Sequence, residues 1–208
     1  MVPATSEADG VLSGIYIDDN KVVSCDQNRI FIKKISDTKL SIVLSKEVVN
    51  EFLKLPFEDK VYINTFKNNI YIEDKNLLLI GSYINKPYPN YESVFPKEEK
   101  NIINLNLKDL EEALVYLAPI IDNEIPKCIL NFNKNILNLK TNNNGCCADT
   151  TIFCESNIEN NLEVKFSFKY LNDMIKANEG KIKITTYNDN IGFLFESKDA
   201  KQYIMPML

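Results

Sequence analysis

The chain has 208 residues, of which 45% are hydrophobic and 25% charged, a balance that suits one large globular domain or two of ordinary size. Its formal net charge of -5 excludes an overall cationic character that would draw it onto nucleic acid or anionic lipid, although a local basic surface is compatible with that total. The absence of histidine excludes Ser-His-Asp, Cys-His and His-ligated metal chemistry within these residues. We therefore expect no cofactor and no metal site.

The five cysteines include a neighbouring pair, Cys146 and Cys147, followed closely by Cys154. Vicinal cysteines do not have the C-x-x-C spacing that wraps zinc, so we interpret them as small core residues, with metal ligation as the alternative. An odd count and no signal peptide indicate a reducing compartment. No apolar run approaches the roughly 20 residues needed to cross a bilayer. We expect a cytoplasmic protein with no membrane partner.

Short segments in which apolar and polar residues alternate predict half-buried antiparallel strands separated by Asx-rich turns. In chain order they are residues 14–17, 29–32, 61–63, 69–72, 136–139 and 181–184. Three other segments have helical spacing of apolar residues. Their apolar faces are Val48, Val49, Phe52 and Leu53; Leu110, Ala113, Leu114 and Leu117; and Tyr170, Leu171, Met174 and Ile175.

The chain contains an internal repeat. Residues 44–72 overlay residues 168–193 as strand, helix, loop and hairpin, and residues 13–25 overlay residues 127–139 as a hairpin. We therefore predict a tandem duplication of one mixed α+β domain, with domains at 1–96 and 97–208.

The two copies are unequal. The second opens with a strand (102–107) and a helix (107–117). In the first copy these elements would fall before residue 1, apart from a helical stub around Ala4 to Ala8. The first domain is therefore expected to be incomplete at its N-terminus.

Four segments resemble, in order, motifs of the bacterial DNA polymerase III β subunit family, the replicative sliding clamps. Residues 86–96 (KPYPNYESVFP) resemble its G-x-F/Y-P-D/N-Y-x-x-V-x-P connector, and residues 203–208 (YIMPML) resemble its Y-x-x-M-P-M-R-L ending. Residues 24–30 (SCDQNRI) resemble its A-T-D-G-H-R-L turn, and residues 166–171 (FSFKYL) resemble F-N-x-x-Y-L. The resemblance implies the processivity fold, with antiparallel sheets and two helices per domain. The chain would cover the second domain of the family, incompletely, and the third.

The same resemblance implies a function without bond chemistry. Such a clamp tethers DNA polymerase to duplex DNA through a hydrophobic peptide-binding cleft between its second and third domains. The implied partners are the DNA polymerase III α subunit, the clamp loader and other proteins with Gln-Leu-x-Leu-Phe-type motifs, non-specific duplex DNA, and further copies in a homo-oligomeric ring. The cleft would use Leu12, Cys25, Arg29, Ile30, Pro89, Val94, Ser167, Tyr170, Ile204, Met205, Pro206 and Met207. The helix lysines expected to face DNA are Lys46, Lys54, Lys108, Lys169 and Lys176.

Alternatives stay open for several of these residues. Leu12, Ile30 and Val94 also fit a hydrophobic core, and helix lysines are commonly solvated surface residues. At the level of the whole chain, one alternative is a truncated clamp-like module that binds the same peptides without encircling DNA. Another is an unrelated enzyme on a duplicated α+β fold. The lack of histidine, of a carboxylate pair and of a phosphate-binding glycine loop disfavours the enzyme.

Overall fold

The computed structural model describes residue 5 and residues 10–58, 60–122, 124–187 and 192–207 of the chain. The chain divides into two compact units, residues 2–91 and residues 92–208, here named the N-terminal and the C-terminal unit. This division lies inside the connector identified in the sequence, a few residues before the expected boundary after Pro96.

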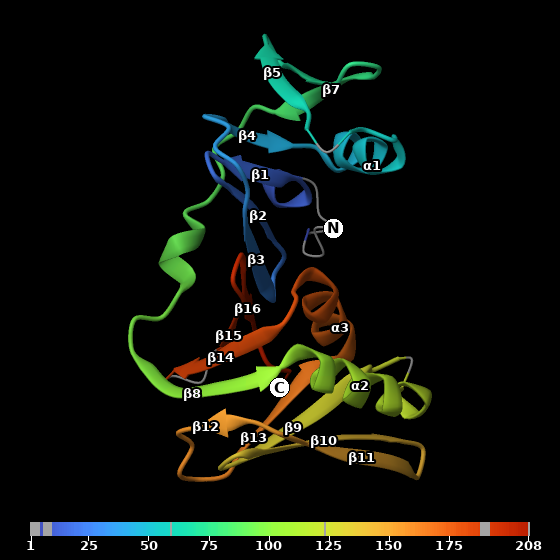
Figure 1. Ribbon diagram of the computed structural model, residues 1–208, viewed down its shortest axis with the longest axis vertical. Helices are drawn as coiled ribbons and strands as arrows, with labels where there is room; N and C mark the ends of the chain where they lie inside the picture. The colour runs from blue at the N-terminus through green and yellow to red at the C-terminus, as the bar shows by residue number, and fades with distance from the viewer. Residues whose placement is uncertain (1–4, 6–9, 59, 123, 188–191, 208) are drawn as a thin grey trace. The chain divides into compact units, whose positions relative to one another are not determined.

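The N-terminal unit contains seven antiparallel strands and, among its described residues, one α-helix (Figure 1). Its elements are η1 (Val11–Ser13), β1 (Ile15–Asp18), β2 (Lys21–Cys25), β3 (Arg29–Lys34), β4 (Ser41–Leu44), α1 (Lys46–Lys54), β5 (Tyr62–Phe66), β6 (Asn69–Glu73) and β7 (Leu78–Ile84). The strand order is β3-β2-β1-β4-β7-β6-β5. Strands β4 and β7 meet only through the pairs Val43 with Ile84 and Leu44 with Tyr83. Two small sheets, β3-β2-β1-β4 and β7-β6-β5, therefore join at this short contact.

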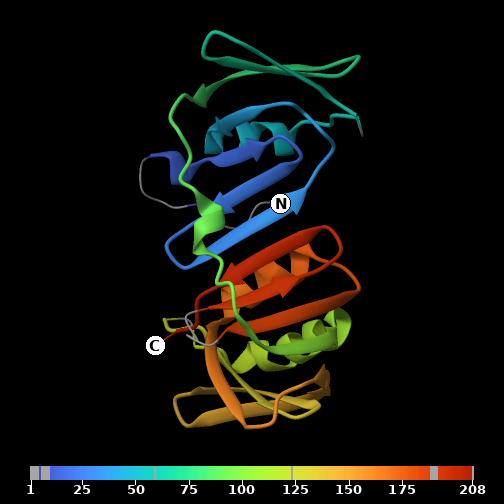
Figure 2. The ribbon, with the colours of Figure 1, turned by 90° about the vertical axis from the view of Figure 1, so that its left-hand side faces the viewer.

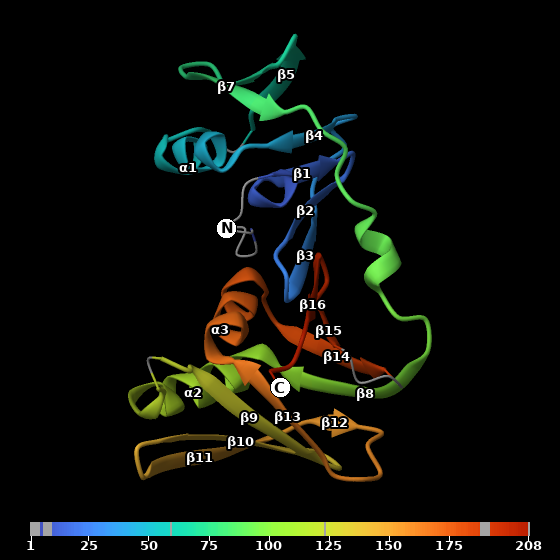
Figure 3. The ribbon, with the colours of Figure 1, turned by 180° about the vertical axis from the view of Figure 1, so that it is seen from behind.

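Helix α1 begins after Ser45, whose hydroxyl accepts a hydrogen bond from the Val48 backbone N–H at 3.4 Å. The apolar spacing then turns Val48 toward the sheet, and α1 lies along β7 (Figure 3). Val48 packs directly on Gly81, where an added Cβ atom would collide with its side chain. A side chain is therefore excluded from this position of β7.

The C-terminal unit has two sheets, with strand orders β12-β8-β14-β15-β16 and β11-β10-β9-β13. The short helix η2 (Tyr91–Val94) spans the division between the units. The further elements are β8 (Glu99–Asn106), α2 (Leu107–Leu117), η3 (Ala118–Ile120), β9 (Lys127–Asn133), β10 (Ile136–Asn143), β11 (Cys146–Phe153), β12 (Glu155–Ser156), β13 (Leu162–Ser167), α3 (Phe168–Ala177), β14 (Lys181–Tyr187), β15 (Phe193–Glu196) and β16 (Ala200–Ile204).

The two helices of the C-terminal unit lie side by side between its two sheets (Figures 1 and 2). Leu110 and Leu114 of α2 and Leu171 of α3 are fully buried in the resulting core. Phe166 of β13 meets Phe193 of β15 edge to face, with ring centroids 5.1 Å apart. Burying a side chain of this size contributes about 1.5–3 kcal/mol, so the core between the sheets holds this unit together.

Each unit contains the same succession of strand, helix and three strands: β4-α1-β5-β6-β7 in one and β13-α3-β14-β15-β16 in the other. Ser45 and Ser167 precede the two helices at equivalent positions. In both units the strand that precedes the helix is also hydrogen-bonded to the last segment of the repeat. In the N-terminal unit, β4 pairs with β7. In the C-terminal unit the Met207 N–H donates to the Lys165 carbonyl at 2.7 Å. The predicted α+β fold and its duplication are confirmed.

The copies also differ as expected. Among the residues that the structure describes, the N-terminal unit has no counterpart of β8 or α2. The predicted stub around Ala4 to Ala8 falls, apart from residue 5, outside the described residues. None of the described helices is long and apolar enough to pass through a bilayer.

Replacing Gly81 with alanine should destabilise the N-terminal unit by about 1–3 kcal/mol, because the new methyl group overlaps Val48 and forces α1 away from β7. Urea unfolding followed by circular dichroism measures this loss. Ser82→Ala is the matched control, since Ser82 is exposed on the other face of the same strand. Equal stability of Gly81→Ala and the unmodified chain would contradict the packing.

Candidate functional site

The turn between β2 and β3 carries three of the expected peptide-binding residues, Cys25, Arg29 and Ile30. Asp26 organises this turn: its Oδ1 accepts from the backbone N–H groups of Asn28 at 2.8 Å and Arg29 at 2.9 Å. Its Oδ2 accepts from Arg29 Nε at 2.9 Å, and the Arg29 side chain is only 5% exposed. This buried arginine is therefore held in place by the carboxylate three residues before it.

The connector packs on the first sheet of the N-terminal unit. Tyr88 stacks on Tyr16 with ring centroids 4.8 Å apart, and its hydroxyl lies 3.3 Å from Cys25 Sγ. Tyr91 donates a hydrogen bond of 2.6 Å to Asp18 Oδ2. Pro89 lies between these two tyrosines and is exposed. The connector thus presents Pro89 from a backbone that is anchored on both sides.

Burial keeps both side chains of the Tyr88–Cys25 contact uncharged. It raises the pKa of the Cys25 thiol above its ordinary value, and it raises the pKa of the Tyr88 hydroxyl even further. Cys25 therefore remains a thiol at neutral pH and is a poor nucleophile. In the candidate site, Cys25 therefore serves as a packed, buried side chain.

The end of the C-terminal unit carries the second group of expected residues. The Met207 N–H bonds to β13, and Pro206 and Met207 are half-buried. Together with Phe193 they line a groove of about 320 Å³, which the β13 residues 162–165 complete. The apolar side of this groove, with the flexible Met207, can accommodate a small hydrophobic side chain, and Glu163 and Lys165 on β13 make the opposite side polar.

The remaining residues of this group have different surroundings. Ser167 caps α3 without a side-chain hydrogen bond, and Tyr170 packs against the core from a half-buried position. Ile204 is fully buried in that core, so it supports the tail from within. Val94 is 49% exposed, which excludes a core role for it.

Two residues of the candidate site, Phe193 and Tyr88, were not among those expected from the sequence. Phe193 lies in a strand pattern typical of core residues, and Tyr88 stood only within the connector motif. Leu12, by contrast, was expected with the Cys25 turn and lies in η1, half-buried. Within the N-terminal unit, the contact between Tyr88 and Cys25 brings the connector and the turn together.

The five expected lysines all lie on helices and are exposed. Lys54 pairs with Glu51 at 2.7 Å and Lys108 with Glu112 at 3.9 Å. Acidic residues on the same helices outnumber the lysines: Glu47, Glu51, Asp109, Glu111, Glu112 and Asp173. Taken together, the described helices therefore have no net positive charge, although α3 alone has two lysines, Lys169 and Lys176, against the single carboxylate of Asp173.

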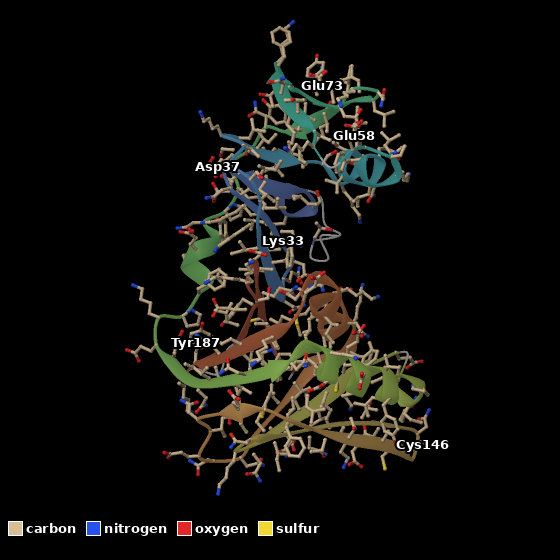
Figure 4. The ribbon with its side chains drawn as sticks, viewed as in Figure 1. Lys33, Asp37, Glu58, Glu73, Cys146 and Tyr187 are labelled. Carbon is tan, nitrogen blue, oxygen red and sulfur yellow. The ribbon has the colours of Figure 1, made fainter. Side chains whose placement is uncertain are left out.

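The interpretation of all the clustered cysteines as core residues is wrong for two of them. Cys154 is buried, but Cys146 and Cys147 are exposed, because they begin β11 directly after the hairpin turn at Gly145 (Figure 4). Within the described ranges, no three cysteine or carboxylate side chains lie together as metal ligands would.

Comparison with known proteins places these features in a family context. Residues 92–208 match the family described as "DNA polymerase III beta subunit, C-terminal domain". The beta sliding clamp of Borreliella burgdorferi is 31% identical over 143 residues, which are 64% of this chain and 37% of that protein. The beta sliding clamp of Mycoplasmopsis pulmonis is 23% identical over 86% of this chain and 48% of its own length.

Solved structures show the same fold. A DNA polymerase sliding clamp from Pseudomonas aeruginosa superimposes with a TM-score of 0.87 at 19% identity, covering 99% of this chain and 62% of that one. A C. crescentus beta sliding clamp gives 0.88 at 17% identity, covering 100% and 61%. The chain spans about half the length or less of the curated relatives it matches.

Removing the Tyr88 ring should expose Cys25. Loss of a stacked aromatic pair costs about 0.5–1.5 kcal/mol, so Tyr88→Ala should accelerate modification of Cys25 by a maleimide up to about tenfold at pH 7.5. Mass spectrometry of the digested protein follows each cysteine separately, with the exposed Cys146 as internal reference. Tyr62→Ala removes an exposed tyrosine instead and should leave Cys25 slow. Fast labelling of Cys25 in the unmodified chain would contradict the anchored connector.

Proposed function

Because this chain belongs to the DNA polymerase III beta subunit family, we propose that it is a sliding-clamp component that tethers replication proteins to DNA by binding their hydrophobic peptide motifs. The role is non-catalytic and cytoplasmic. The chain spans only part of the length of these relatives, so the proposal concerns the share of the activity that residues 1–208 carry.

The groove beside the C-terminal tail is the observation that carries the proposal. Phe193, Pro206 and Met207 form its apolar side, the β13 residues from Leu162 to Lys165 form the other side, and the Met207 N–H bonds to the Lys165 carbonyl. A preformed groove with one apolar side suits an anchor residue of a short peptide, because the protein loses little conformational entropy on binding. Met207 can repack around different anchors, which suits a site that serves several partners in turn.

The residues of the N-terminal unit support the same function. Arg29 is held by Asp26, and Pro89 is presented by the anchored connector. We propose that both groups of residues contribute to the binding of one class of peptide, the Gln-Leu-x-Leu-Phe type. The expected partners are the DNA polymerase III α subunit, the clamp loader and other replication proteins with such a motif.

A second candidate is a module that binds these peptides without encircling DNA. The charge of the helices favours it, because α1, α2 and α3 taken together carry six carboxylates and five lysines. Loose, non-specific retention of duplex DNA depends on lysines and arginines that neutralise phosphates. Homo-oligomerisation into a ring would have to place additional positive charge around the DNA.

Met205→Asp should weaken binding of a fluorescent Gln-Leu-x-Leu-Phe peptide by at least about 30-fold, the effect of losing a contact worth 2 kcal/mol. A charge at this half-buried position of the tail must be desolvated when the peptide binds. Fluorescence anisotropy measures the affinity, which we expect near 10 µM for the unmodified chain, on the order of small anchor-driven interfaces.

Val115→Asp is the control for this measurement, because Val115 is an exposed apolar residue on α2. It should leave the affinity unchanged. Unchanged affinity in Met205→Asp would remove the tail from the site.

Retention on DNA separates the two candidates. A ring should have an oligomeric mass by light scattering and should stay on nicked circular plasmid until a restriction enzyme linearises it. Lys169→Glu combined with Lys176→Glu should then reduce retention, because both lysines lie on α3 and each contact with phosphate contributes to the salt dependence. A monomer that passes through the gel-filtration column without plasmid would contradict encircling and support the second candidate.

A further inference from the structure

The sheet formed by β7, β6 and β5 in the N-terminal unit has one covered face. Ile70 and Ile72 of β6 point to this inner face and are buried, and Gly81 of β7 lies there against Val48 of α1. Figures 1 and 3 show α1 on this side of the sheet. Among the described residues of the N-terminal unit, no helix or strand covers the other side, which is here named the open face.

The strand register assigns nine side chains to the open face, because directly paired residues point to the same side of a sheet. They form three rows across the strands: Tyr62, Glu73 and Leu78; Asn64, Tyr71 and Ile80; and Phe66, Asn69 and Ser82. Five of the nine are large apolar or aromatic residues. A solvated face of an antiparallel sheet ordinarily carries polar residues, so this composition needs a reason.

Four of these apolar residues are more than half exposed: Tyr62 (72%), Phe66 (63%), Leu78 (54%) and Ile80 (53%). Counted at about 200 Å² for each large side chain, their exposed parts amount to roughly 500 Å² in one copy. A contiguous apolar patch of several hundred Å² is typical of an interaction site. Two such faces in contact would bury roughly 1,000 Å² in total, which reaches the size that a specific interface needs.

The two ends of the open face carry opposite charges. Glu73 is exposed at the end of β6 (Figure 4). Lys67 directly follows β5 at the opposite end, and its ammonium group lies 5.5 Å from the centre of the Phe66 ring and therefore on the same face. These two ends of the sheet lie roughly 13 Å apart, the length of the strand from Asn69 to Glu73. Such a surface is complementary to a reversed copy of itself.

Charge also selects how two copies would meet. With a twofold axis that runs across the strands, Tyr62 of each copy faces Phe66 of the other, and Glu73 lies beside Lys67 of the other. Tyr71 and Ile80 then face their own counterparts near the axis. A twofold axis along the strands would instead place Glu73 opposite Glu73 and Lys67 opposite Lys67. Opposed like charges disfavour that second arrangement.

We propose that the open face is an interface between two copies of this chain, related by a twofold axis across the strands. The apolar rows provide the attraction, and two symmetry-related pairs of Glu73 and Lys67 fix the orientation. The sheets of the two copies pack face to face, as in a β-sandwich. This inference does not rest on the proposed function, because it uses neither the groove beside the C-terminal tail nor the turn between β2 and β3.

Sedimentation velocity of the full chain tests the interface. We expect a reversible equilibrium of monomer and dimer, with a Kd on the order of 10 µM for an interface of this small size. Phe66→Lys places a charge against Tyr62 of the other copy and should weaken dimerisation at least tenfold. Phe153→Lys is the matched control, because Phe153 is 81% exposed on β11 of the C-terminal unit, and it should leave dimerisation unchanged. Circular dichroism verifies that both variants are folded.

Charge reversal tests the orientation of the two copies. Glu73→Lys and Lys67→Glu should each weaken dimerisation about tenfold, because like charges then meet at two symmetry-related places in one interface. The two substitutions combined in one chain restore opposite charges, so the double variant should dimerise as the unmodified chain does. A merely structural role of either residue would not produce this rescue.

Four results would overturn the proposal. They are a chain that remains monomeric at about 200 µM, roughly twenty times the expected Kd; a dimer that persists in Phe66→Lys, which other surfaces must then form; weakening by Phe153→Lys equal to that by Phe66→Lys; and no rescue in the double charge reversal. Met205→Asp should dimerise normally, and Phe66→Lys should bind the Gln-Leu-x-Leu-Phe peptide normally. Failure of this interface and failure of the peptide-motif site are therefore distinguishable.

Discussion

The backbone hydrogen bond from Met207 to Lys165 is the constraint on which the candidate site depends. It ties the end of the chain to β13 without using a side chain. The side chains of the tail are therefore free to line a groove, while their backbone is held by a sheet that is itself anchored in a large core. The same connection recurs between β4 and β7 of the N-terminal unit, where it joins two small sheets. Backbone hydrogen bonding to the strand before the helix thus fixes the last segment of both repeats. In the second repeat it also positions the candidate binding surface.

Much of the fold could be predicted because its helices and strands are amphipathic. The apolar spacing in residues 48–53, 110–117 and 170–175 indicated the three helices, and each forms where expected. The duplication was visible because both copies repeat the same order of strand, helix and hairpin. Periodicity reports which face of an element is buried, and that information is local to the sequence.

The details of the site depend on contacts that periodicity does not encode. Phe193 belongs to a strand pattern and still lines the groove, because the tail ends beside it. The buried Arg29 is explained by Asp26, whose carboxylate bonds two backbone groups as well as the guanidinium. Cys146 looked like a core residue by type, but its position after a hairpin turn leaves it outside. Each of these outcomes depends on tertiary position and not on residue type.

The single described helix of the N-terminal unit has a consequence for the energetics of the whole chain. Stability in a protein is distributed according to how much apolar surface each region buries. The C-terminal unit has two helices packed between two sheets, whereas the cluster around Ile70 and Val48 relies on one helix and many half-buried neighbours. The two halves are therefore expected to melt separately, so that one midpoint cannot describe the molecule. A protease that samples transient openings would enter through the first half and leave the second as a resistant fragment.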